Sequence, residues 1–89
     1  MERNETLIAA FADELRARRN LLALSQEELA HRVGVNRTYM AKLELAQNQP
    51  TLTVLQAIAE ALATSLPELL HGVKARHDQR SNSLTATSH

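Results

Sequence analysis

Residues 24–44, LSQEELAHRVGVNRTYMAKLE, constrain the fold of this chain more than any other stretch. Ser25 followed by Glu28 forms a capping box, which predicts that a helix begins there. Gly34 can take the left-handed conformation that often ends a helix, and Asn36 is a good N-cap for the next one. The stretch therefore predicts two short helices joined by a sharp turn.

Helical signals continue on both sides of this stretch. Asn4 can cap a first helix, whose apolar residues recur at helical spacing. Thr51 can cap a fourth helix, and Ser65 with Glu68 forms a second capping box for a short fifth one. No β pattern or internal repeat is present, so we expect an all-α fold of five helices.

The composition changes after Gly72. The remaining residues, VKARHDQRSNSLTATSH, are polar and almost without apolar side chains. Such a segment cannot bury enough apolar surface to offset the cost of ordering it. We therefore expect a domain over residues 4–72 and a polar, disordered tail over residues 73–89.

Length and composition exclude several classes of protein. A chain of 89 residues is one domain with a marginal core, which oligomerisation would stabilise. The absence of cysteine excludes disulfides and thiolate metal sites and fits a reducing cytoplasm. Acidic residues interrupt the apolar residues of the first 20 positions, so neither a signal peptide nor a membrane span is expected. The four histidines lack a spacing suited to metal binding, and we expect no metal or cofactor.

Charge is unevenly distributed along the chain. Ten basic and ten acidic residues give a formal net charge of zero, which argues against a histone-like protein that binds nucleic acid by bulk charge. Between positions 16 and 44, however, six basic residues face only three acidic ones. The predicted basic patch comprises Arg16, Arg18, Arg37 and Lys42. Lys74, Arg76 and Arg80 would form a flexible basic arm in the tail. With only two aromatic residues, a surface for stacking unpaired bases is not expected.

Residues 15–70 resemble the Cro/phage-repressor type of helix-turn-helix domain, the XRE family. The resemblance lies in LSQEELA, in GV, in YM followed by LE, in a Pro-Thr that opens the fourth helix, and in SLPELL, in this order. It implies a compact five-helix domain of the phage-repressor type that binds double-stranded DNA. Within the family, NRTYMAKLE is similar to the recognition helix of small restriction-modification controller proteins, which are one-domain dimers.

The resemblance also implies roles for individual residues. Gln26 matches a glutamine that binds a phosphate and braces the recognition helix, which we place at residues 37–45. The matching base-reading positions are Arg37, Thr38 and Lys42, and those that touch the DNA backbone or flanking bases are Asn36 and Tyr39. Arg19 and Glu44 match a structural pair between the first and third helices. Independently of the family, Arg37 and Lys42 can donate hydrogen bonds to guanine, and Thr38 can contact thymine.

Other interpretations of these residues remain. Arg37, Thr38 and Lys42 are also compatible with an ordinary solvated helix face, and Tyr39 with a place in the core. Two positions depart from the family pattern, since alanine replaces glycine before the second helix and glycine is missing after the third. After the third helix, Asn48 is expected to take the left-handed conformation in place of that glycine.

We expect a sequence-specific, double-stranded DNA-binding regulator of transcription that acts as a homodimer on a palindromic operator. One helix in one groove reads too few base pairs to select a site in a genome. Leu66, Leu69 and Leu70 are expected to form the dimer interface. The alternative is a protein-interaction module with a protein partner, such as the antitoxin of a toxin-antitoxin pair. An enzyme is not expected, because no catalytic cluster or phosphate-binding loop is visible.

Overall fold

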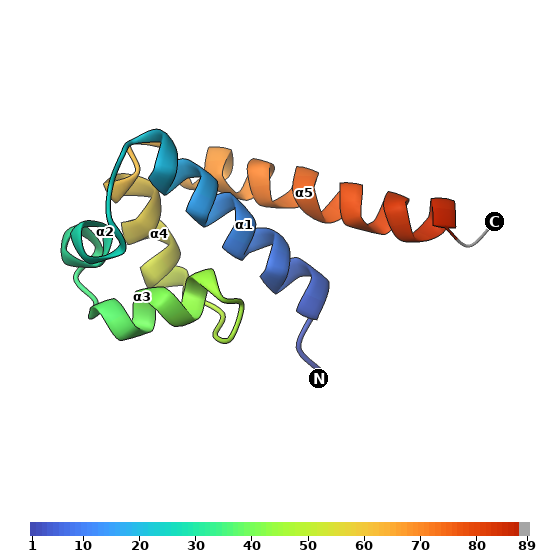
Figure 1. Ribbon diagram of the computed structural model, residues 1–89, viewed down its shortest axis with the longest axis horizontal. Coiled ribbons are helices and arrows are strands. Elements are labelled where there is room, and N and C mark those ends of the chain that lie inside the picture. Colours follow the sequence, from blue (N-terminus) through green and yellow to red (C-terminus); the bar gives the residue numbers. More distant parts are fainter. Residues whose placement is uncertain (88–89) are drawn as a thin grey trace.

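The computed structural model describes the backbone of residues 1–87 and the side chains of residues 1–81. These residues form five helices and no strand, which confirms the predicted all-α fold (Figure 1). The helices are α1 (Glu5–Leu21), α2 (Gln26–Val33), α3 (Arg37–Glu44), α4 (Leu52–Ala61) and α5 (Leu66–Thr87). No helix in this part of the chain is long and apolar enough to cross a membrane.

The first four helices begin where the sequence predicts, because a side-chain oxygen caps each one. In each helix this oxygen accepts a hydrogen bond from the backbone N–H three residues further on. The capping residues are Asn4, Ser25, Asn36 and Thr51. At α2 the capping box is complete, since the Ser25 N–H also donates to the Glu28 carboxylate at 3.0 Å. That backbone hydrogen bond lowers the pKa of Glu28.

Four helices are followed by a residue with a left-handed backbone. Gly34 has φ 88°, as expected, but alanine takes this conformation elsewhere, with φ 55° at Ala23, 60° at Ala46 and 56° at Ala63. The prediction that Asn48 supplies the left-handed residue after α3 is wrong. Ala46 stands directly after the C-cap, where the bond from Gln47 N–H to the Lys42 carbonyl, 2.9 Å, closes the turn.

All five helices contribute to one hydrophobic core. Its fully buried side chains include Leu15, Leu29, Met40, Ile58 and Leu69, one from each helix. Burying such side chains is the main source of stability in a domain of this size. Leu69 was predicted to lie at a dimer interface, but with none of its surface exposed it belongs to the core of the protomer.

The last helix differs most from the sequence-based expectation. Instead of a short helix followed by a disordered tail, α5 continues to Thr87 and lies beside α1 (Figure 1). Val73 is buried, and the charges that made this segment look unstructured are paired with α1: Arg76 with Glu14 at 2.7 Å, and Arg80 with Asp13. Residues 88–89 lie outside the described part, and a separate unit at residues 4–72 stays a prediction.

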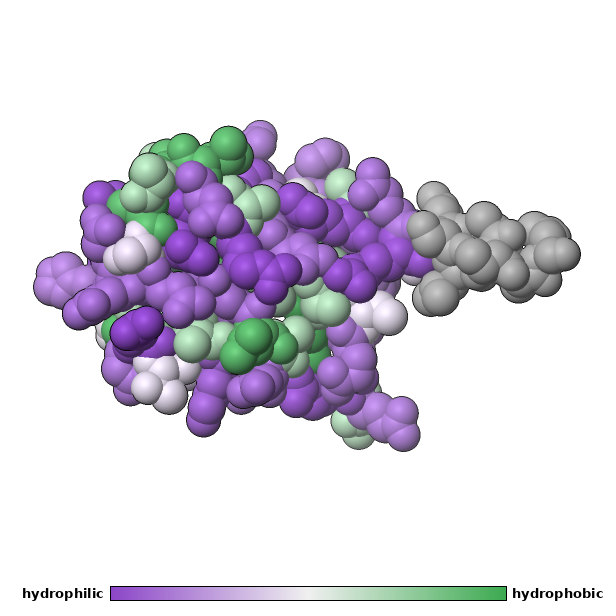
Figure 2. Space-filling view, viewed as in Figure 1, coloured by the Kyte–Doolittle hydropathy of each residue, from purple (hydrophilic) through white to green (hydrophobic). Residues whose placement is uncertain are grey.

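Hydrophilic side chains cover most of the face shown in Figure 2, and hydrophobic ones form small, separate patches. One patch lies over the C-terminal end of α1 (Figure 2). Leu21 and Leu22, at that end, are exposed.

Candidate nucleic-acid interface

The turn between α2 and α3 gives α3 its direction. The N–H groups of Gly34 and Val35 both donate to the carbonyl of Ala30, at 2.9 and 3.0 Å. The left-handed backbone of Gly34 then changes the direction of the chain, and Asn36 caps α3 only two residues later. The two predicted helices and their sharp turn are therefore confirmed, and α3 lies along the outer edge of the molecule (Figure 1).

The inner and outer faces of α3 differ sharply in burial. Met40 and Leu43 are fully buried in the core, whereas Arg37, Thr38 and Lys42 are exposed. Thr38 and Lys42 are four positions apart and so share one side of the helix, with Arg37 at its first turn. The structure thus presents the three predicted base-reading residues to solvent, and their contact with bases stays a prediction.

A buried carboxylate holds the inner face of α3. Glu44 is 2% exposed and receives two hydrogen bonds from Arg19, Nε to Oε2 at 2.7 Å and Nη2 to Oε1 at 2.9 Å. Gln26 donates to Oε1 of the same carboxylate at 3.1 Å. The hydrogen bonds between Arg19 and Glu44 raise the pKa of the Arg19 guanidinium. The predicted Arg19–Glu44 pair and the bracing role of Gln26 are therefore confirmed.

Gln26 retains a donor for a further partner. Only one hydrogen bond is formed by its amide nitrogen, which carries two N–H groups. The residue stands at the first position of α2, where backbone N–H groups and the helix dipole favour an anion. A phosphate contact at this position is compatible with the geometry and stays a prediction.

Asn36 and Tyr39 have structural roles in addition to the predicted DNA contacts. The Asn36 side chain accepts from the Tyr39 N–H at 2.7 Å, which caps α3 and leaves its amide nitrogen without a partner among the described residues. Tyr39 is half-buried and packs against the hydrophobic core. Tyr39 therefore contributes to the edge of the core, which is the alternative role that the sequence analysis considered for it.

Ion pairs narrow the predicted basic patch. Arg16 binds Asp13 at 2.5 Å and Arg18 binds Glu14 at 2.6 Å, so neither offers an uncompensated charge. The cations that form no ion pair among the described residues are Arg32, Arg37 and Lys42, all in α2 or α3. Arg16 and Arg18 are thus paired within α1, which leaves Arg37 and Lys42, within the described part of the chain, as the uncompensated charges of the predicted patch, and its binding to phosphates stays a prediction. The flexible basic arm is wrong, because residues 74–80 are helical and Arg76 and Arg80 pair with carboxylates of α1.

A helix-turn-helix family model matches residues 15–69, which is more than half of the chain. The chain belongs to the helix-turn-helix family of the XRE type. It is a DNA-binding regulator of transcription, which confirms this general part of the functional prediction.

Individual helix-turn-helix proteins support the assignment. Control protein C.SmaI of Serratia marcescens is 40% identical over 68 residues, covering 76% of this chain and 81% of that protein. The restriction-modification controller protein C.AhdI of Aeromonas hydrophila superimposes with a TM-score of 0.68 and 34% identity, covering 70% of this chain and 94% of the other. The clp gene regulator ClgR of Corynebacterium glutamicum shares the fold, with a TM-score of 0.85, 21% identity and coverage of 92% and 87%.

Two features of this helix-turn-helix protein had no clear signal in the sequence. The first is a pair of arginines from outside α2 and α3: Arg16 donates to the carbonyl of Glu44 at the end of α3, and Arg3 to those of Ala46 and Gln47 in the loop that follows. Sequence spacing does not reveal such contacts, since the donors lie far away in the chain.

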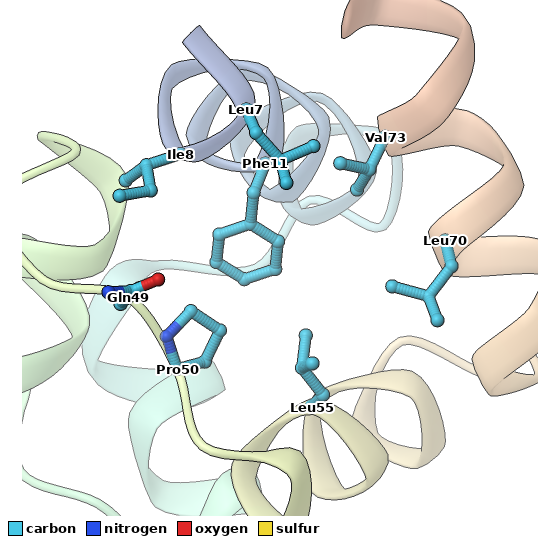
Figure 3. Close-up of a pocket in the computed structure, with 8 residues that line it drawn as sticks. All are labelled: Leu7, Ile8, Phe11, Gln49, Pro50, Leu55, Leu70 and Val73. Atoms are coloured by element: carbon cyan, nitrogen blue, oxygen red, sulfur yellow. The ribbon is translucent and has the colours of Figure 1, made fainter. Parts of the chain in front are cut away.

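The second feature is an apolar groove of about 180 Å³ between α1, α4, α5 and the loop before α4 (Figure 3). Seven of its eight lining residues are apolar, and the eighth is Gln49. The residues around the groove are Leu7, Ile8, Phe11, Gln49, Pro50, Leu55, Leu70 and Val73. Within the described part of the chain, no group of three or more histidine or carboxylate side chains could hold a metal ion, at the groove or elsewhere.

Proposed function

We propose that the protein binds DNA as a homodimer at a palindromic operator, with α3 of each protomer in the major groove. Arg37, Thr38 and Lys42 read base edges. Gln26 and Asn36 bind the DNA backbone, and Tyr39 touches the backbone or a flanking base. DNA binding itself follows from the family, whereas the operator symmetry and these contacts are the proposal.

The proposal rests on the two basic side chains of α3 that are exposed and form no ion pair with any described residue. Most Lys and Arg side chains of the chain lie within 4 Å of a carboxylate, but Arg37 and Lys42 do not. They lie on a helix whose opposite face is fixed by Glu44 and the core. A rigid helix with free donors on its outer face suits hydrogen bonding to guanine O6 and N7.

The homodimer is supported by the apolar groove. Leu7 and Leu70, which line the groove, are large apolar side chains that are 37% and 41% exposed. Leu52 lies two residues after Pro50 and is 72% exposed. A second copy that covers this surface would bury apolar area that one small protomer leaves in water. Leu70, and no longer Leu69, is the central contact of the proposed interface.

Within the family, we place the protein with the regulators of restriction-modification systems. The support is the 40% identity to a control protein and the 34% identity to a restriction-modification controller protein. Both matches cover most of the length of those proteins, so the likeness is not confined to the helix-turn-helix unit.

The test is selection of bound duplexes from a random DNA pool, followed by sedimentation of the complex. We expect enrichment of an inverted repeat whose half-sites are about one helical turn apart. The complex should contain two protomers on one duplex. Enrichment of a single half-site by a monomer would contradict the homodimer. No enrichment at all would contradict operator binding and favour the module with a protein partner.

A further inference from the structure

Two arginines from outside α2 and α3 bind backbone carbonyls at the end of α3 and in the loop that follows it. Arg16 donates from Nη1 to the carbonyl of Glu44 at 3.0 Å. Arg3, in the segment before α1, donates from Nη1 to the carbonyl of Gln47 at 3.1 Å and from Nη2 to that of Ala46 at 3.3 Å. The last carbonyls of a helix have no partner within it, so the bond from Arg16 satisfies such a group at Glu44, whereas Arg3 binds carbonyls of the loop that follows α3.

The turn held by Arg3 is conformationally strained. Ala46 has φ 60°, a left-handed conformation that costs free energy for any residue with a Cβ. Such a conformation persists only where the surroundings fix it. The two nitrogens of the Arg3 guanidinium bind the carbonyls of Ala46 itself and of Gln47, the residue that follows. The planar fork of arginine therefore fixes the orientation of both peptide groups.

We propose that Arg3 is a positioning residue for DNA binding. By fixing the turn at Ala46 it holds the last turn of α3, which carries Lys42, and the loop that follows. The inference rests on the proposed contact of α3 with DNA. With eight residues, α3 has little rigidity of its own, and reading contacts must be held within about 0.5 Å.

Other side chains support α3 up to its last residue, Glu44, and Arg3 holds the loop that follows the helix. Gly34 and Asn36 fix its first turn, and Glu44 fixes its inner face. Arg3 is itself held by Glu5, whose carboxylate lies 3.4 Å from its Nε. The N-terminal segment thus becomes part of the DNA-binding apparatus without touching a base.

A double-mutant cycle tests this role. Arg3→Ala is made in the natural chain and in Ala46→Gly, where glycine takes the left-handed conformation at no steric cost. The probe is the duplex that the natural protein enriches from a random pool. We expect Arg3→Ala to weaken binding about 3- to 10-fold in the natural chain and less than about twofold beside Ala46→Gly. The dependence on salt and the base preference should not change. Lys74→Ala, which removes an exposed cation of α5, is the matched control and should bind normally.

Two results would overturn the proposal. If Arg3→Ala weakened binding equally in both backgrounds and reduced the salt slope by about one, Arg3 would be a direct phosphate contact instead. If affinity did not change, Arg3 would have no part in DNA binding.

A measurement without DNA separates this inference from the proposed function. The N–H groups of Gln47 and Asn48 donate to the Lys42 carbonyl at 2.9 and 3.4 Å, so their hydrogen exchange reports on the turn. Arg3→Ala should accelerate exchange there and leave the core of α1 unchanged; unchanged exchange at these two amides would refute the positioning role. Failure of the proposed function would appear separately, as the natural protein enriching no duplex.

Discussion

The carboxylate of Glu14 lies directly against the backbone of Gly72. A Cβ at Gly72 would stand 3.1 Å from Oε1 of Glu14 and still closer to Oε2. Glu14 is 8% exposed, and its carboxylate receives hydrogen bonds from Arg18 at 2.6 Å and Arg76 at 2.7 Å. Gly72 therefore does not end α5 but gives α1 room to approach it, and Glu14 joins the two helices.

This packing predicts that the effect of Gly72→Ala changes sign with residue 14. In the natural chain the new methyl group displaces the carboxylate from Arg18 and Arg76, so we expect a net loss of about 1–2 kcal/mol of unfolding free energy. In Glu14→Ala the space is free, and Gly72→Ala should stabilise α5 by about 1 kcal/mol through helix propensity. Urea denaturation of the four proteins measures both effects. Stabilisation in both backgrounds would show that the carboxylate does not fill this space.

Glu14 also predicts how stability depends on pH. Burial raises the pKa of this carboxyl, but the hydrogen bonds and charges of Arg76 and Arg18 outweigh burial and lower it below the usual 4.5. A carboxyl with a lowered pKa in the folded state stabilises the fold above its unfolded pKa. This contribution should be lost as the pH falls from near 4.5 through the lowered value.

Glu14→Gln removes the titrating group and tests that expectation. Thermal unfolding between about pH 6 and pH 3 should show a shallower loss of stability than in the natural chain. Glu27→Gln, which removes the same charge at an exposed position of α2, is the control. Equal slopes for Glu14→Gln and the natural chain would contradict the assignment.

Local signals in the sequence predicted where the helices begin and the turn between α2 and α3, whereas contacts between distant residues determine the course of α5. Capping residues such as Ser25 and Asn36 act within three residues, so their effect is visible in the sequence. From the sequence, Gly72 and Arg76 indicated the end of the domain and a polar tail. Both contact Glu14 of α1, and contacts between residues so distant in sequence have no local signal. Arg19 and Glu44 are also distant, and only the family resemblance predicted their pairing.

The left-handed alanines predict a simple gain in stability. Ala23, Ala46 and Ala63 each follow a helix with positive φ, where a Cβ costs about 1–2 kcal/mol relative to glycine. Part of the gain is offset because glycine makes the unfolded chain more flexible. Ala23→Gly and Ala63→Gly should each raise the unfolding free energy by up to about 1 kcal/mol. Urea denaturation measures the change.

The control is Ala75→Gly, at an exposed position inside α5. There the backbone is helical, so glycine should lower the unfolding free energy by about 1 kcal/mol. If all three substitutions destabilised the protein alike, left-handed strain would not be the cause.

The proposed dimer predicts that Leu70→Asp gives a folded monomer. Leu70 is 41% exposed at the rim of the groove, so a carboxylate there is solvated in the protomer but would be buried without a partner in the dimer. Sedimentation at tens of micromolar, with circular dichroism to verify the fold, measures the result. Leu21→Asp at the end of α1, where the side chain is 84% exposed, is the control and should remain dimeric. A dimeric Leu70→Asp protein would place the interface elsewhere.

The last prediction separates base reading from phosphate binding on the same face. Arg37 is exposed and forms no ion pair among the described residues, so its donors are available to a guanine. Arg37→Ala should cost about 1–3 kcal/mol on the preferred duplex and remove the preference at one position of each half-site. Gln26→Ala should instead weaken binding to all sequences alike, because a phosphate contact carries no sequence information.

Both variants are compared by repeating the selection and by titrating the enriched duplex against one with a changed half-site. Gln26 also donates to Glu44 at 3.1 Å, so its loss can shift α3, and thermal unfolding must accompany the binding data. Gln26→Glu is not a suitable replacement, since it would set a second carboxylate beside the buried one. A profile that changed for Gln26→Ala and not for Arg37→Ala would reverse the two roles, and α3 would then read DNA through residues other than Arg37.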